Sequence, residues 1–146
     1  MNTPPVADRI GQHVTSDETC AVERKCWGDT RRIGLGSSWD VHYLNLIAGG
    51  YCSRHRHLHK ANLFYVATGR IAVEFFNPDE SVPYKTVEVG PEQTLSVPAL
   101  VWHRFRVLES GIAVEIYWPG SWNPDDIDRA EQGGMNPNEK WIDAGE

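Results

Sequence analysis

The middle of this chain is a succession of short strand-like segments separated by turn residues. β-Branched and aromatic residues are concentrated in these segments, and Gly, Pro, Asn and Asp lie between them. The segments are Trp39–Ile47, Leu63–Ala67, Ile71–Phe76, Tyr84–Val89, Thr94–Val97, Trp102–Leu108 and Ile112–Trp118. Many short strands at this spacing predict an antiparallel sandwich or barrel. Because 146 residues suffice for one domain with a core and are too few for two ordinary ones, we predict a single all-β domain.

Turn residues mark where the chain is expected to reverse. Gly69-Arg70 has the composition of a tight hairpin turn, residues 77–81 that of a looser one, and residues 90–92 that of a third. Residues 122–129 resemble a capped turn or a short helix.

The two ends of the chain differ from the middle. Residues 1–17 are polar, contain Pro4-Pro5 and show no sustained period, so we expect a flexible arm or a segment that pairs only in a dimer. The C-terminal residues are rich in Gly and Asn, with Trp141 as one anchor. The expected organisation is an arm over residues 1–17, a barrel over 18–130 and a C-terminal tail over 131–146.

The composition argues against a polyanionic partner. The net charge is −6 at pH 7, and no run of basic residues exceeds a pair. Nucleic-acid and anionic-membrane binding therefore have little electrostatic support, and a small-molecule ligand or substrate is the expected partner. No apolar stretch is long enough to cross a membrane, and the N-terminus lacks the pattern of a signal peptide. We expect a soluble, cytoplasmic protein.

The cysteines predict reduced thiols. Cys20, Cys26 and Cys52 are odd in number and have no Cys-x-x-Cys spacing, which argues against a disulfide framework and against a cysteine zinc site. If the strand around it is regular, Cys52 points away from His55, so its expected role is packing.

Two histidines two residues apart are the strongest sign of chemistry. In an extended strand such residues point to the same face, so His55 and His57 can direct both imidazoles at one point. His103, on a later strand, arrives where a hairpin return would bring it. Three imidazoles suit Zn, Fe, Ni, Cu or Mn and would leave coordination positions open. We therefore predict a divalent metal site formed by these histidines, with the identity of the metal left open.

These segments resemble the paired motifs of the cupin superfamily. The first motif is Gly, five residues, His-x-His, three or four residues, Glu, six residues, Gly; here it is read as Gly49, His55, His57, Asn62 and Gly69, with the Glu replaced. The second motif is represented by Gly90, Pro98 and His103, with a longer interval before the Pro and Leu100 where Gly is usual. The resemblance implies a jelly-roll β-barrel with the metal at its mouth.

A closer resemblance is to the cupin domain of type II mannose-6-phosphate isomerases. Residues 53–64 align without a gap on that family's ligand strand. Trp27-Gly28, Val97-Pro98-Ala99 and His103-Arg104 match flanking motifs, and Glu115, Gly120 and the Asp-Asp-Ile-x-Arg of residues 125–129 match its closing segment. The similarity covers about residues 22 to 129 and implies a sugar-phosphate isomerase or epimerase.

The departures from that family fall on the implied metal shell. By position, His55 stands where the family has Gln, and Asn62 stands where it has Glu. Three neutral imidazoles leave the full charge on a divalent ion, so the ion should hold anionic ligands more readily. The substrate would supply the missing negative charge, and Asn62 would line the vacant fourth position.

The same resemblance suggests residues for catalysis and binding. Glu115 matches the family's Glu on the last strand and is the candidate base for moving a proton between adjacent carbons. Lys60, Arg104 and Arg129 match basic positions that would hold a phosphate or carboxylate of the substrate. The alternative interpretation is that each of these residues is an ordinary charged residue on the solvent-exposed surface.

Strand alternation suggests which aromatic residues border the pocket. Phe64 and Phe105 share faces with Asn62 and His103, so they are the expected cavity walls. Tyr51 and Tyr117 stay undecided. His59 is expected near the entrance or behind the ligands, and His13 and His42 are expected to be unrelated to the site.

Three functions remain open from the sequence. The protein is either a metal-dependent isomerase or epimerase, a three-histidine Fe(II) dioxygenase, or a non-catalytic binder of a small molecule or metal. Cupins commonly pair through edge strands and N-terminal segments, so the resemblance also implies a homodimer.

Overall fold

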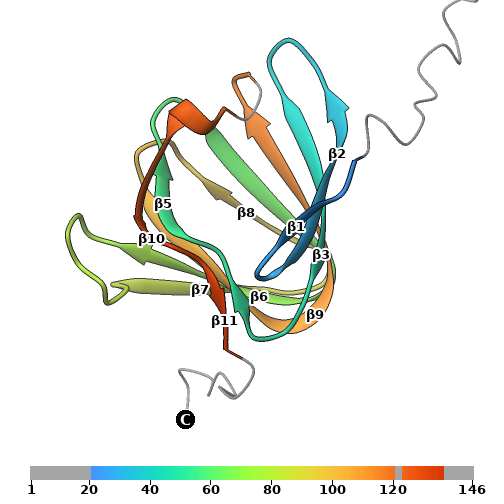
Figure 1. The fold of residues 1–146 in the computed structure, drawn as a ribbon. Coiled ribbons are helices and arrows are strands. Elements are labelled where there is room, and N and C mark those ends of the chain that lie inside the picture. The colour runs from blue at the N-terminus through green and yellow to red at the C-terminus, as the bar shows by residue number, and fades with distance from the viewer. Residues whose placement is uncertain (1–20, 121–122, 137–146) are drawn as a thin grey trace, which may run out of the picture.

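In the computed structural model, the structure describes residues 21–120 and 123–136, which form one curled antiparallel sheet (Figure 1). The strands are β1 (Glu23–Lys25), β2 (Gly28–Leu35), β3 (Asp40–Leu46), β4 (Gly50–Tyr51), β5 (Arg54–His57), β6 (Ala61–Phe76), β7 (Lys85–Val89), β8 (Gln93–Val97), β9 (Trp102–Trp118), β10 (Ile127–Glu131) and β11 (Gly134–Met135). A short 3-10 helix, η1 (Pro124–Asp126), precedes β10. The prediction of an all-β jelly-roll barrel is confirmed.

Two long strands, β6 and β9, form the centre of the sheet. They pair along almost their whole length, from Ala61↔Trp118 to Phe76↔Trp102. One half of β9 also pairs with β3, and the other half pairs with β4 and β5. Because the sheet curls, Figure 1 shows β3 on one side of the interior and β5 and β10 on the other.

The prediction of a hairpin turn at Gly69-Arg70 is wrong. Residues 61–76 form a single strand that bends instead of reversing, with irregular register to β9 between Val66 and Ile71. Gly69 has a φ of +81°, and a Cβ on the opposite Gly111 would lie 2.1 Å from the Thr68 carbonyl oxygen. Glycine at both positions permits the close approach and the bend, so a turn signal here marks a barrel corner.

The sheet contains strands both before the first segment expected to be a strand and after the expected end of the barrel. β1 and β2 lie before the first predicted strand, and β11 pairs with β4 past residue 130, the expected end of the barrel. The capped turn expected near residues 122–129 is present as η1, where Asn123 Oδ1 accepts a hydrogen bond from the Asp125 amide at 2.9 Å. The arm expected over residues 1–17 lies outside the described residues.

Alternation along the strands builds the core. On β6, Phe64, Val66, Ile71 and Val73 are each at most 1% exposed and point inward. They pack against inward residues of the neighbouring strands, among them Leu44, Val97, Phe105 and Val107. Some of these core residues, among them Leu44, Phe64 and Phe105, also line a cavity together with inward polar residues.

Among the described residues, no helix reaches the length and hydrophobicity needed to cross a bilayer. The homodimer expected from the sequence stays a prediction, which light scattering in solution would test.

Candidate metal centre

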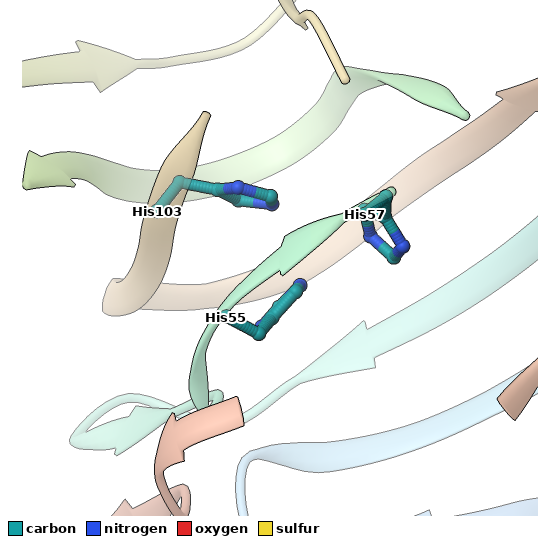
Figure 2. A group of neighbouring side chains, drawn as sticks. All are labelled: His55, His57 and His103. Carbon is teal, nitrogen blue, oxygen red and sulfur yellow. The ribbon is translucent and has the colours of Figure 1, made fainter. Parts of the chain in front are cut away.

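The histidine cluster is built by strand alternation on β5 and by pairing of β5 with β9. His55 and His57 point into the barrel, while Arg54 and Arg56 of the same strand point outward to Glu131 and Asp128. His55 lies directly opposite His103 in the β5–β9 pairing. Figure 2 shows the three rings converging from these two strands.

The rings of the three histidines are close enough to share one ion. Ring centroids lie 5.0 Å apart for His55 and His57, 4.5 Å for His55 and His103, and 5.8 Å for His57 and His103. One ring nitrogen from each residue lies within 4.8 Å of the other two. Nitrogens bound to a common Zn²⁺ lie about 2.0–2.1 Å from it and therefore at most about 4.2 Å from one another, so the three rings would move closer together on binding an ion.

Backbone carbonyl groups orient two of the rings. His55 Nδ1 lies 2.7 Å from the Ser53 carbonyl oxygen, and His103 Nδ1 lies 2.8 Å from that of Val101. An Nδ1–H that donates to a carbonyl leaves the Nε2 lone pair free for a metal. The Nε2 atoms of His57 and His103 are buried without a hydrogen-bond partner in the described part of the chain. Buried, unpartnered imidazole nitrogens facing each other fit a divalent ion.

The environment keeps these imidazoles neutral. Burial lowers the pKa of His57 and of His103 to about 4, and it holds the pKa of His55 well below its usual value. The neighbouring imidazoles lower the pKa of His55 and His57 further, and so does the positive charge of Arg129. The unprotonated form is the one that binds a metal, so the site is ready for an ion at neutral pH.

These depressed pKa values give the metal-free protein a pH-dependent stability. Between about pH 6.5 and pH 4, these histidines are protonated in the unfolded chain and neutral in the folded one, so acid favours unfolding. We expect the free energy of unfolding to fall by about 1.4 kcal/mol per pH unit for each such histidine as the pH decreases through this window. Urea titrations of the metal-free protein at several pH values measure this slope. A His103→Asn variant with an unchanged slope would contradict the assignment.

A cavity of about 240 Å³ opens beside the histidines. Of the residues predicted from the sequence, the ones that line it are His55, His57, Phe64, Phe105, Glu115 and Arg129. Phe64 and Phe105 pack edge to face with ring centroids 5.7 Å apart and form an apolar wall, as strand alternation predicted. Tyr117, undecided from the sequence, also lines the cavity, and its ring centroid is 5.4 Å from that of His57.

Glu115 is held in this cavity by two side chains. The Tyr117 hydroxyl donates to its Oε1, and the Asn62 amide donates to its Oε2 at 3.1 Å. Burial raises the pKa of Glu115, while the two donated hydrogen bonds act in the opposite direction. Asn62 was expected to line the vacant metal position. Its amide nitrogen instead positions Glu115, and its Oδ1 is buried without a described partner.

Lys60 and Arg104, which the sequence suggested as substrate-binding residues, are not among the residues that line the cavity. Lys60 forms a buried ion pair with Asp126, at 3.1 Å between Nζ and Oδ2. Arg104 points to the opposite face of β9 from His103 and binds Glu74, at 2.7 Å between Nη2 and Oε2. Consecutive residues of a strand face opposite sides, which is why only one residue of the His103-Arg104 pair reaches the site.

His42 was expected to be unrelated to the site, and this is wrong. It lines the same cavity, lies opposite Glu115 in the β3–β9 pairing, and packs edge to face with Tyr117. Its Nε2 is 3.1 Å from Oδ1 of the fully buried Asp40. The sequence did carry a signal for this position, because Asp40, His42 and Leu44 alternate along β3 and therefore share its inward face. His59, by contrast, is largely exposed, and its ring binds Asp126.

No protein-family model and no curated protein sequence matches the chain. Solved structures do match in shape. Oxalate decarboxylase from Bacillus subtilis matches with a TM-score of 0.67 and 15% identity, over 80% of this chain and 31% of that one. Streptomyces PAC13 with uridine matches with a TM-score of 0.63 and 13% identity, over 80% and 88%. KdgF from Halomonas sp. matches with a TM-score of 0.61 and 15% identity, over 73% and 94%.

The chain spans about a third of the length of the oxalate decarboxylase chain, and nearly the whole length of PAC13 and KdgF. At such low identity these likenesses concern the fold alone. Together with the curled antiparallel sheet and the paired long strands, they show that this chain is a jelly-roll β-barrel of the cupin type.

Proposed function

We propose that this protein binds a divalent metal ion, Zn, Fe, Mn or Ni, through His55, His57 and His103 and uses it on a small molecule in the adjoining cavity. The observation that carries this proposal is the convergence of three neutral imidazoles, two of them with buried, unpartnered Nε2 atoms. Buried polar atoms are otherwise almost always hydrogen-bonded, so their convergence points to an ion that satisfies them.

Within this proposal, proton transfer of the isomerase or epimerase type is the reaction that the cavity favours. When bound, the ion would supply Lewis-acid polarisation of a substrate carbonyl. Glu115 would accept and return the proton, because its carboxyl group lines the cavity and its raised pKa brings it closer to neutral pH. Tyr117 and Asn62 fix the direction of the carboxyl group, and Phe64 and Phe105 exclude water on one side.

Two other functions use the same residues and are separated by experiment. A three-histidine Fe(II) dioxygenase would contain iron and consume O₂ with a thiol substrate, and a non-catalytic binder would keep its metal and turn over nothing. Elemental analysis of the purified protein comes first, followed by assays of mannose 6-phosphate conversion and of O₂ uptake on a panel of thiols. A protein that takes up no divalent ion would end the proposal in all three forms.

Replacing Glu115 with Gln is expected to lower turnover of mannose 6-phosphate by at least about 100-fold with the bound metal retained, since general acid–base catalysis contributes roughly 10²–10⁴-fold. Glu109→Gln is the matched control, because Glu109 lies on the same strand with a side chain that is 64% exposed. Steady-state kinetics with metal analysis on the same samples measures both effects. Equal rates for E115Q and E109Q would remove Glu115 from the reaction.

A further inference from the structure

Arg129 has an unusual position among the arginines. It lies on β10 directly opposite His55, so the two side chains emerge side by side from neighbouring strands, and both line the cavity. Its side chain is exposed and has no ion pair with any described residue. Apart from Arg24, the other described arginines each pair with a carboxylate: Arg31, Arg32, Arg54, Arg56, Arg70, Arg104 and Arg106.

The charged side chains that line the cavity balance one another without a metal ion, so a divalent ion would add two positive charges that no described side chain offsets. Two carboxyl groups and two basic side chains line it: Glu23, Glu115, Lys25 and Arg129. Glu23 and Lys25 form an ion pair with each other, and Glu115 is occupied by Tyr117 and Asn62. Three neutral imidazoles add no negative charge. With a divalent ion present, that ion and the guanidinium of Arg129 would be two adjacent positive centres with no carboxylate assigned to either.

The cavity also limits the size of what can balance them. Its volume of about 240 Å³ is below the roughly 300–1,000 Å³ of pockets that take drug-sized ligands. A molecule of this size that satisfies two positive centres must carry its two anionic groups a short distance apart.

We propose that the ligand of this site is a short molecule with two oxyanion groups, one placed at the three-histidine centre and the other bound by the Arg129 guanidinium. This inference rests on the proposed metal function and adds the chemical class of the ligand. Arg129 suits the role because a guanidinium binds a carboxylate or phosphate through two parallel N–H donors. The apolar wall of Phe64 and Phe105 would contact the carbon chain between the two groups.

The test is a calorimetric titration of the metal-loaded protein with malonate, succinate and glutarate, and with acetate as the probe that lacks a second carboxylate. We expect at least one diacid to bind more tightly than acetate. Arg129→Gln should weaken the binding of that diacid by about tenfold or more, because a hydrogen bond to a charged group contributes roughly a factor of ten to affinity. The metal content should stay unchanged. Arg24→Gln is the matched control: it removes the same charge from outside the cavity lining, and Arg24 likewise has no ion pair with a described residue.

The outcomes separate the two proposals. A protein that takes up no metal overturns the proposed function and this inference with it. Metal uptake with no diacid bound more tightly than acetate overturns the inference alone. Equal diacid affinities for R129Q and R24Q would also overturn it, since the effect would then be one of net charge.

Discussion

Replacing His103 with Ala is expected to weaken metal binding by at least about 100-fold. Zinc bound by four protein ligands gains roughly 10–16 kcal/mol, so one imidazole accounts for about 3 kcal/mol or more. His103 is 1% exposed and is the only one of the three ligands that β9 contributes, so no other described residue of the cluster can replace it. Competition titration against a metal-chelating dye measures the loss.

The control is His42→Ala, because His42 lines the same cavity and lies outside the cluster. We expect it to retain the metal affinity of the unchanged protein. His57→Gln is a second variant of the cluster that preserves more side-chain volume, and circular dichroism checks that each variant folds. Wild-type affinity in both H103A and H57Q would show that the ion binds elsewhere.

Replacing Glu74 with Ala is expected to lower the free energy of unfolding by about 3 kcal/mol. Glu74 is 5% exposed, and its two carboxylate oxygens accept hydrogen bonds from Arg104 Nε at 2.8 Å and Arg106 Nε at 2.7 Å. Removing one partner of a buried ion pair costs about 3–5 kcal/mol, because the remaining charge stays desolvated. The arginines keep partial exposure, which places the expected loss at the lower end. Urea denaturation measures it.

Glu88→Ala is the comparison for this substitution. Glu88 has a side chain that is 44% exposed and lies 3.7 Å from Arg70, so we expect a loss of at most about 1 kcal/mol. Similar losses for the two variants would show that the ion pairs of Glu74 with Arg104 and Arg106 do not contribute to the stability of the barrel. The same ion pairs hold the Arg104 guanidinium against Glu74.

The parts of the site that depend on strand alternation could be predicted from the sequence. His55 and His57 are two residues apart, and this spacing alone places both rings on one face. The same rule placed Phe64 beside Asn62 and Phe105 beside His103. Strand pairing between β5 and β9 then brings His103 opposite His55, which is where the expected hairpin return put it.

The parts that depend on long-range pairing could not be predicted. Gly69 signals a turn locally, but pairing with β9 continues on both sides of it, so the strand bends at a barrel corner. Alternation along β3 marks His42 as inward-facing, but only the pairing of β3 with β9 places it opposite Glu115. Family position suggested Lys60 and Arg104 as ligand-binding residues, but their side chains are bound by Asp126 and Glu74.

The most direct test of the central claim is anomalous diffraction from crystals of the protein loaded with zinc. The account predicts one strong anomalous peak, about 2.0–2.1 Å from a ring nitrogen of each of His55, His57 and His103. A peak at any other position, or no peak between these three rings when elemental analysis finds zinc in the crystals, would contradict it.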